Sequence, residues 1–127
     1  MSSSEVIKLL KEKEIEYVDL RFTDPKGKLQ HLTIDSTAID EEMLNDGVFF
    51  DGSSIAGWKA INESDMILKP DLERKIIDPF TSHNTLVLFC DILDAVNKNP
   101  YERDPRGIAK KAEAYLKETG IGDKAYF

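Results

Sequence analysis

Residues 85–92 constrain the fold of this chain most, because nearly all of them are apolar. A strand with one face in water alternates apolar and polar residues, whereas a strand covered on both faces is almost continuously apolar. The sequence therefore predicts a strand at the centre of a sheet. Cys90 lies inside this run, so we expect it to be a core residue and not a metal ligand.

The first part of the chain predicts a helix followed by a β-hairpin. Residues 4–13 carry apolar side chains at helical spacing, and Ser4 is expected to cap the first free N–H groups. Residues 17–22 then alternate between apolar and polar side chains, which is typical of a half-buried strand. The sequence Asp-Pro-Lys-Gly at residues 24–27 predicts a type I turn, and residues 29–34 supply the returning strand.

The middle of the chain predicts shorter elements. These are a second short helix at residues 36–44, an apolar run at 48–50, and two short strands at 66–68 and 75–77. Ser36 or Thr37 is expected to cap the helix, and Pro70 to separate the two strands. Helix, hairpin, helix, short strands and central strand in this order predict an α+β fold, with a helix packed on one face of a small mixed sheet.

Beyond the central strand, residues 94–100 are polar and are expected to form a linker. A third helix should follow the linker, because its start and its end both carry strong signals. Asp104 is suited to the N-cap and Pro105 to the first helical position, while Gly120 is placed to end the helix.

This third helix shows an apolar stripe with no evident partner in the sequence. The stripe consists of Ile108, Ala112, Tyr115 and Leu116. Residues 125–127 look like the start of another strand, which is a poor place for a protein to end. We therefore expect residues 1–98 to form one domain and residues 99–127 to open a second, truncated domain of a larger protein.

The composition limits the classes of function. The chain has 127 residues and a formal net charge of -7 at pH 7, and an acidic surface repels phosphate backbones, so we expect no nucleic-acid partner. No apolar run approaches ~20 residues, and the start lacks a secretory signal, so we expect no membrane span and no export. The single cysteine cannot form an internal disulfide. Together these features predict a cytoplasmic protein.

Residues 51–58, Asp-Gly-Ser-Ser-Ile-Ala-Gly-Trp, are the one segment that asks for a chemical explanation. Asp and Ser often hydrogen-bond their own backbone, so the segment can be simply a turn. It can also be a polar binding loop at a strand end, in which the ionised Asp51 attracts a cation. Trp58 at its end suits either the core or an interface. Spacing alone leaves these interpretations open.

Ser54 also half-matches a nucleophile elbow, which would make the protein a serine hydrolase. That motif needs a helix after the serine, and Gly57 argues against one. The base would have to be His31 or His83, and neither position indicates a catalytic pair. No His, Cys or carboxylate residues show the spacing of metal ligands, so the sequence assigns no metal site to this chain.

Seven short segments carry a family resemblance. They are residues 17–24 (YVDLRFTD), 26–28 (KGK), 50–59 (FDGSSIAGWK), 61–66 (INESDM), 77–80 (IDPF), 90–92 (CDI) and 103–106 (RDPR). Together they resemble the bacterial type I glutamine synthetases, in order and without an obvious gap from about residue 15 to residue 127. The segments around Asp51 and around Asn-Glu-Ser-Asp are the specific ones.

The resemblance implies a β-grasp N-terminal domain at about residues 14–98, followed by the first helix of a large catalytic domain. It also implies that the full-length protein uses ATP, with Mg²⁺ or Mn²⁺, to join ammonium to glutamate and give glutamine. Its subunits would assemble as a dodecamer of two stacked rings. Asp51 would bind ammonium and help to deprotonate it in a site shared with a neighbouring subunit, and Ser54 would support it.

The resemblance also implies what this chain lacks. The family's metal-binding, nucleotide-binding and glutamate-binding residues lie beyond residue 127, so the chain alone is expected to be inactive. A free-standing β-grasp module, which binds a partner through the Asp51 loop without any chemistry, is the alternative.

Overall fold

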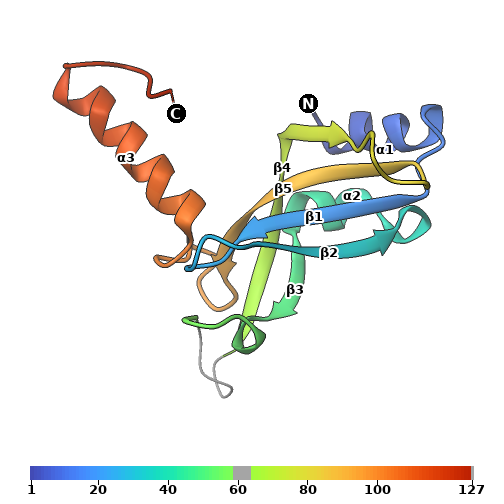
Figure 1. Cartoon of the computed structure of the whole chain (residues 1–127), viewed down its shortest axis with the longest axis horizontal. Coiled ribbons are helices and arrows are strands. Elements are labelled where there is room, and N and C mark those ends of the chain that lie inside the picture. The colour runs from blue at the N-terminus through green and yellow to red at the C-terminus, as the bar shows by residue number, and fades with distance from the viewer. Residues whose placement is uncertain (59–63, 127) are drawn as a thin grey trace.

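A computed structural model describes residues 1–58 and 64–126 of the chain. In chain order the elements are α1 (Ser3–Glu12), β1 (Tyr17–Thr23), β2 (Leu29–Asp35), the 3-10 helix η1 (Ser36–Ala38), α2 (Glu41–Asp46), β3 (Val48–Asp51), the 3-10 helix η2 (Gly52–Ser54), β4 (Asp65–Ile77), β5 (Thr85–Asp94) and α3 (Pro105–Thr119) (Figure 1). The strands form one five-stranded sheet in the order β2-β1-β5-β4-β3. β1 and β5 are parallel and the other pairs are antiparallel, which confirms the predicted mixed sheet and α+β class.

β5 lies in the middle of the sheet, as its apolar run predicts. Leu86, Leu88 and Ile92 on one face of the strand are fully buried, and Val87 on the other face is also buried. Both faces are therefore covered at the start of the strand, and the second face is half-buried from Phe89 onward. Cys90 is buried too, which confirms it as a core residue, and burial raises the pKa of its thiol.

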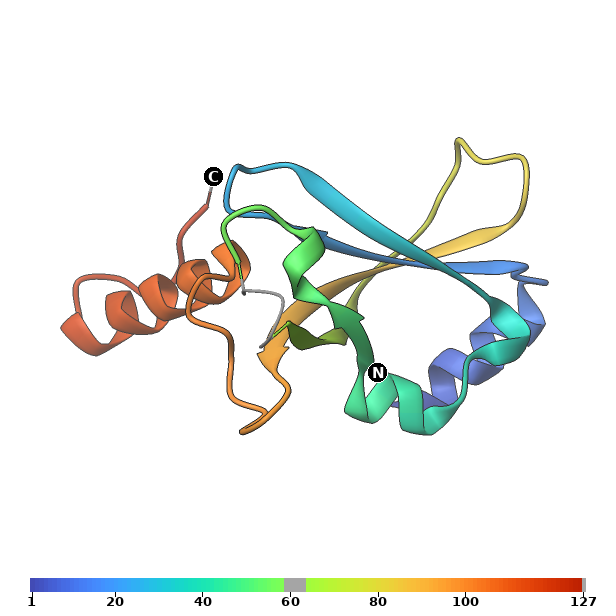
Figure 2. The same ribbon diagram turned by 90° about the horizontal axis from the view of Figure 1, so that it is seen from below.

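α1 and α2 lie on the same side of the sheet (Figure 2). Val6 of α1 and Leu44 of α2 belong to one buried cluster with Leu20 of β1 and Leu88 of β5. Burial of each such side chain stabilises the fold by about 1.5–3 kcal/mol. The covering layer therefore contains two helices, where the sequence predicted one.

The predicted hairpin of β1 and β2 is confirmed. Asp24 closes its turn, because the carboxylate accepts hydrogen bonds from the backbone N–H groups of Lys26 (3.0 Å) and Lys28 (2.9 Å). Gly27 has a φ of +85°, a conformation that residues with a Cβ rarely adopt. The turn chemistry thus sets the register of the two strands.

The predicted caps of the first two helices are wrong. Ser2, not Ser4, caps α1, because Ser2 and Glu5 form a reciprocal capping box that Ser4 cannot form. Asp40 caps α2 by accepting a hydrogen bond from the backbone N–H of Met43 at 2.7 Å.

The helix predicted at residues 36–44 is in fact two elements. Ile39 is extended and separates η1 from α2. Asp35 caps η1, so neither Ser36 nor Thr37 caps a helix as predicted. The caps of η1 and α2 are both aspartates, which accept from the free N–H groups at least as well as a hydroxyl does.

The two short strands predicted at residues 66–68 and 75–77 are parts of one strand, β4. Its pairing with β5 changes register between Pro70 and Lys75. The φ of proline is compatible with an extended backbone, and a bulge accommodates its missing N–H group. Pro70 therefore interrupts the ladder without ending the strand.

The predicted linker at residues 94–100 is a closed turn. The backbone N–H of Lys98 donates to the carbonyl of Asp94 at 2.8 Å, and the N–H of Asp94 donates to the carbonyl of Asn99 at 2.9 Å. The chain therefore reaches α3 on a fixed path.

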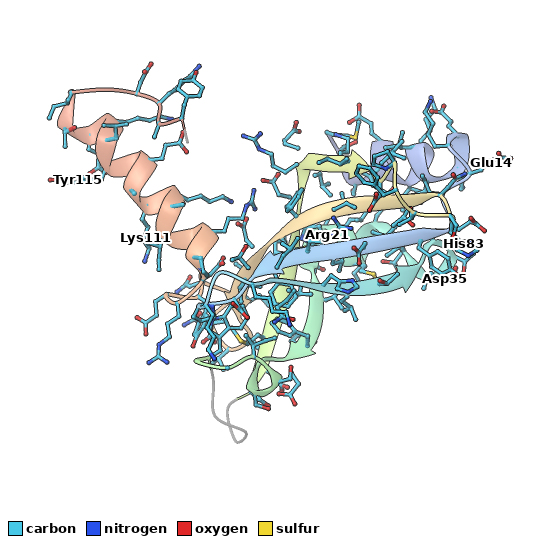
Figure 3. The ribbon with its side chains drawn as sticks, viewed as in Figure 1. Glu14, Arg21, Asp35, His83, Lys111 and Tyr115 are labelled. Carbon is cyan, nitrogen blue, oxygen red and sulfur yellow. The ribbon has the colours of Figure 1, made fainter. Side chains whose placement is uncertain are left out.

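α3 begins and ends at the predicted residues. Asp104 is its N-cap, Pro105 its first residue, and Gly120 its C-cap with a φ of +71°. All of its residues are described and none of them is buried; Tyr115 projects away from the sheet (Figure 3). The strand predicted at residues 125–127 is not formed at its first two residues, and the third lies outside the described part of the chain.

A polar network surrounds Asp19 of β1. Asp19 and Arg21 (labelled in Figure 3) alternate with the core residues of the strand, so their side chains lie on the sheet face opposite α1 and α2. Asp19 is only 5% exposed. Its carboxylate accepts hydrogen bonds from Arg21 Nε (2.7 Å), His31 Nδ1 (2.8 Å) and Thr33 Oγ1 (3.0 Å). Arg21 also donates to Asp78 at 3.0 Å, which ties β1 to the segment after β4.

Asp19→Asn is expected to lower the free energy of unfolding at neutral pH by about 1.5–3 kcal/mol, the usual contribution of hydrogen bonds to an ionised group. Burial tends to raise the pKa of Asp19, but the hydrogen bonds from Arg21, His31 and Thr33 outweigh it, so the folded-state pKa is lowered. This stabilisation is present above the unfolded pKa and is lost as the pH falls through the lowered folded pKa.

Urea unfolding at neutral pH and at about pH 2 measures this effect, and the difference between wild type and variant should shrink in acid. The exposed Asp123→Asn is the control and should match the wild type. A difference of equal size at both pH values would contradict the assignment.

Candidate functional site

Asp51 is the last residue of β3, which is an edge strand of the sheet. It is paired in register with Asp65, the first residue of β4, so two carboxylates stand at this end of the ladder. The side chain of Asp51 is exposed. The segment from residue 52 to residue 58 leaves the sheet here, below the end of β3 in Figure 1. Asp51 thus stands at a strand end, where the sequence predicted a loop.

The Asp51 carboxylate and Ser54 share one tight turn. Oδ1 of Asp51 accepts hydrogen bonds from the backbone N–H (2.9 Å) and the hydroxyl (2.7 Å) of Ser53. The hydroxyl of Ser54 donates to the backbone carbonyl of Asp51 at 2.7 Å. The turn interpretation and the binding-loop interpretation are therefore compatible, because the turn fixes the carboxylate in place.

The environment of Asp51 favours its ionised form. The hydroxyl and backbone N–H of Ser53 hold the pKa of Asp51 below its usual value, and a further hydrogen bond from Ser64 acts in the same direction. Ionised at neutral pH and open to solvent, the carboxylate can attract a cation or accept hydrogen bonds from one.

The rest of the segment is anchored to the sheet and the core. The N–H of Gly52 donates to the carbonyl of Ser64 at 2.7 Å. Ile55 and Trp58 are buried, at 9% and 6% exposure. Asp51 is therefore carried by a turn whose two ends are both fixed, which limits how far the carboxylate can move.

Gly52 is needed at its position because the chain passes too close to β4 for a side chain. A Cβ there would lie 2.2 Å from Sδ of the fully buried Met66 and 3.0 Å from the carbonyl oxygen of Ser64. Close approach of two backbone segments is a common reason for glycine in a strand-end loop.

Gly52→Ala is expected to lower the free energy of unfolding by about 1–3 kcal/mol, the usual cost of overpacking a filled site. Urea unfolding measures this change. Gly107→Ala in α3 is the matched control, because its Cβ would have ordinary contacts of 3.6 Å or more. That variant should be as stable as the wild type or slightly more stable, since Gly107 lies in the first turn of α3, where alanine gains less over glycine than in a helix interior. An unchanged free energy of unfolding in Gly52→Ala would show that Met66 and its surroundings can move to make room for the Cβ.

The structure does not form a nucleophile elbow at Ser54. Its hydroxyl is bonded to the Asp51 carbonyl, and the residue ends a 3-10 helix that does not continue as an α-helix through residues 55–58, the described residues that follow. His31 lies on β2, and His83 lies 3.4 Å from Glu16, at the end of the sheet opposite the Asp51 segment (Figure 3). The serine and the two histidines are therefore not assembled into a hydrolase site.

Metal and membrane features are also absent from the described residues. Among residues 1–58 and 64–126, no three His, Cys, Asp or Glu side chains are grouped to hold a metal ion. No described helix has the length and apolar character needed to cross a membrane.

One part of the site is not visible in the sequence. The indole N–H of Trp58 donates to the carbonyl of Arg103 at 3.3 Å, and the Arg103 guanidinium donates to the carbonyl of Gly57 at 3.0 Å. Trp58 is thus a core residue; the sequence alone left open whether it lies in the core or at an interface. The partners are 45 residues apart, and no local pattern signals such a contact.

The sequence of this chain was compared with those of known protein families and of individual proteins. The profile of the family described as "Glutamine synthetase, beta-Grasp domain" matches residues 14–95. Glutamine synthetase of Rhizobium meliloti is 62% identical over 125 residues, and that of Escherichia coli K12 is 53% identical over 127 residues. These matches cover 98% and 100% of the chain, which spans 27% of the length of each relative.

Solved structures show the same fold. The cryoEM structure of Plasmodium falciparum glutamine synthetase superposes with a TM-score of 0.83 and 27% identity, over 94% of this chain and 23% of that one. A ligand-free GmaS structure gives a TM-score of 0.79 at 24% identity, over 90% of this chain and 26% of that one, a likeness of fold alone. The chain therefore belongs to the glutamine synthetase family, and it corresponds to the N-terminal portion that contains the β-grasp domain.

Proposed function

We propose that this chain is part of a cytoplasmic glutamine synthetase, which joins ammonium to glutamate at the expense of ATP. Its contribution is the Asp51 loop, which completes the ammonium site of a neighbouring subunit in a ring-shaped dodecamer. The observation that carries the proposal is 53–62% identity to glutamine synthetases over nearly the whole chain. Under this proposal, residues 99–127 open the catalytic domain, and the chain alone does not synthesise glutamine.

The proposed role of Asp51 has two parts that need different environments. Attraction of ammonium needs an anion, and the hydrogen bonds from Ser53 keep Asp51 ionised. Acceptance of a proton from ammonium needs a more basic carboxylate. Coverage of the exposed side chain by a neighbouring subunit would raise its pKa through desolvation and so supply that basicity.

Ser54 supports this role through the backbone. Its hydroxyl bonds to the carbonyl of Asp51, so it fixes the peptide that carries the carboxylate. The exposed Ser54 can also present its hydroxyl oxygen to a cation held by Asp51. The two predicted site residues therefore act as one unit.

The ATP and the Mg²⁺ or Mn²⁺ ions of the proposed reaction do not fit the described residues of this chain. No three metal-ligating side chains are grouped among them. Phosphate groups prefer helix N-termini with free N–H groups, and the N-terminus of α3 is already capped by Asp104. Under this proposal, the nucleotide and metal ligands belong to the part of the full-length protein that lies outside this chain.

The test is subunit complementation in the full-length protein. One subunit type carries Asp51→Ala, and the other is inactivated in the portion outside this chain. Neither homo-oligomer should make glutamine. After mixing and reassembly in equal amounts, intact halves meet at about one interface in four, so activity should return toward that fraction, as head-to-tail rings allow.

Lack of rescue, with mixed oligomers shown to form, would mean that the loop acts within its own subunit. Full activity of the Asp51→Ala homo-oligomer would instead favour a loop that contacts a partner without any chemistry.

A further inference from the structure

An aromatic cluster brackets the Asp51 loop. Phe50 directly precedes Asp51 and Trp58 ends the loop, and their rings meet edge to face with centroids 6.2 Å apart. Trp58 also stacks on Phe22 of β1 at 5.8 Å and meets Tyr101 edge to face at 5.8 Å. Aromatic pairs in these geometries stabilise contacts beyond the area they bury. The two ends of the loop are therefore closed on each other by packing.

Arg103 adds two hydrogen bonds to this packing, and together they form what we call the Arg103 clasp. Its guanidinium donates to the carbonyl of Gly57, and its own carbonyl accepts from the indole of Trp58. Figures 1 and 2 both show the loop beside the segment that leads into α3. Two reciprocal hydrogen bonds thus join the loop to the chain immediately before Asp104.

The start of α3 is itself fixed to the sheet. The buried Asp104 accepts a hydrogen bond from the backbone N–H of Ile92 in β5 at 3.1 Å. Arg106 donates to Asp91 of β5 at 2.7 Å and pairs with Asp71 of β4. Arg103 therefore precedes a helix start that is fixed to the sheet. Through its hydrogen bonds, Arg103 can fix the position of the loop relative to β4 and β5.

We propose that Arg103 is a positioning residue for the ammonium site, acting through Gly57 and Trp58 to hold the Asp51 carboxylate where ammonium binds. This inference rests on the proposed function of Asp51. Arg103 is exposed, so its guanidinium can be removed without opening the core. A misplacement of about 1 Å in a catalytic group can cost about 10²-fold in rate, so a loosened clasp should act on the ammonium step.

The experiment compares Arg103→Ala, Arg103→Lys and Trp58→Phe in the full-length enzyme. Arg103→Ala should raise the KM for ammonium or lower the rate of the amide-forming step by about 10–100-fold. The KM values for ATP and glutamate should stay near those of the wild type. Arg103→Lys keeps a cationic donor for the Gly57 carbonyl and should restore part of the loss. Trp58→Phe keeps an aromatic ring but lacks the N–H group, so it should show a smaller effect of the same kind.

Glu102→Ala, at the exposed neighbouring position, is the matched control and should behave as wild type. Unchanged ammonium kinetics in Arg103→Ala would overturn the inference, and so would an equal loss for all three substrates, which indicates a general structural role. Asp51→Asn, measured in parallel, separates the proposed function of Asp51 from the positioning role of Arg103. If Asp51→Asn is fully active, the proposed function fails; if Asp51→Asn is impaired while Arg103→Ala is normal, only the positioning role fails.

Discussion

Asp51→Asn in the full-length protein is expected to slow glutamine formation by about 10²–10⁴-fold, the usual loss when a general base is removed. Asparagine keeps a side-chain oxygen that can accept the hydrogen bonds from Ser53, so the turn should survive. The substitution removes the negative charge, and the remaining amide oxygen is too weakly basic to take a proton from ammonium. The variant therefore tests the charge of Asp51 separately from the shape of its loop.

The phosphorylation of glutamate should be largely intact in this variant, because Asp51 is proposed to act on ammonium and not on ATP. Single-turnover transfer of labelled γ-phosphate measures that step, and glutamine formation with ammonium measures the second one. Asp46→Asn, an exposed carboxylate at the end of α2, is the control and should leave both steps unchanged. Equal loss of both steps in Asp51→Asn would mean that the loop organises the whole site.

Asp104→Ala is expected to lower the free energy of unfolding by about 2–4 kcal/mol, as the sum of a lost helix cap and an unsatisfied buried N–H group. Asp104 is only 1% exposed, and its carboxylate accepts from the N–H groups of Arg106 in α3 and Ile92 in β5, each at 3.1 Å. Urea unfolding measures the loss. Hydrogen exchange at the Ile92 amide should accelerate more than exchange at Leu86, which lies far from the bond.

Asp104→Asn is the conservative counterpart, because asparagine is an equally good cap for α3. Its single side-chain oxygen replaces only one of the two acceptors, since Oδ2 of Asp104 accepts from Ile92 and Oδ1 from Arg106. Burial raises the pKa of Asp104, although the backbone hydrogen bonds oppose that shift. The wild type therefore loses stability as the pH rises from the unfolded pKa through the raised folded pKa, and the Asn variant does not. The variant should gain on the wild type as the pH rises above the unfolded pKa of an aspartate, about 3.9. Two parallel pH profiles would contradict this sign.

Asp19 and Asp104 thus contribute to the acid dependence of stability with opposite signs. Asp19, whose folded pKa is lowered, stabilises the fold above the unfolded pKa, whereas ionisation of Asp104 costs stability over the same range. Neither behaviour could be predicted from the sequence, where both residues are aspartates in polar or alternating segments. Their environments differ because Asp19 gathers three side-chain donors and Asp104 is enclosed between a strand and a helix.

Local chemistry alone determined several features of this protein. The bounds of α3 follow from a cap, a proline and a glycine, each of which acts on the backbone within one helical turn. The central position of β5 follows from its unbroken apolar run, and the β1–β2 turn from Asp24 and Gly27. The exposed aspartate at a strand end, with Ser54 on the same turn, was also predictable, because Asx turns are built from neighbouring residues.

Only the tertiary structure decided which of these local elements meet. The parallel pairing of β1 with β5, the second hydrogen bond of Asp104, and the clasp between Arg103 and Trp58 all join segments that are distant in sequence. Such contacts depend on how whole apolar faces pack, and a change in one face moves every partner on it. The sequence therefore specified the Asp51 turn itself, whereas the packing of α3, β5 and the aromatic cluster specified where that turn is held.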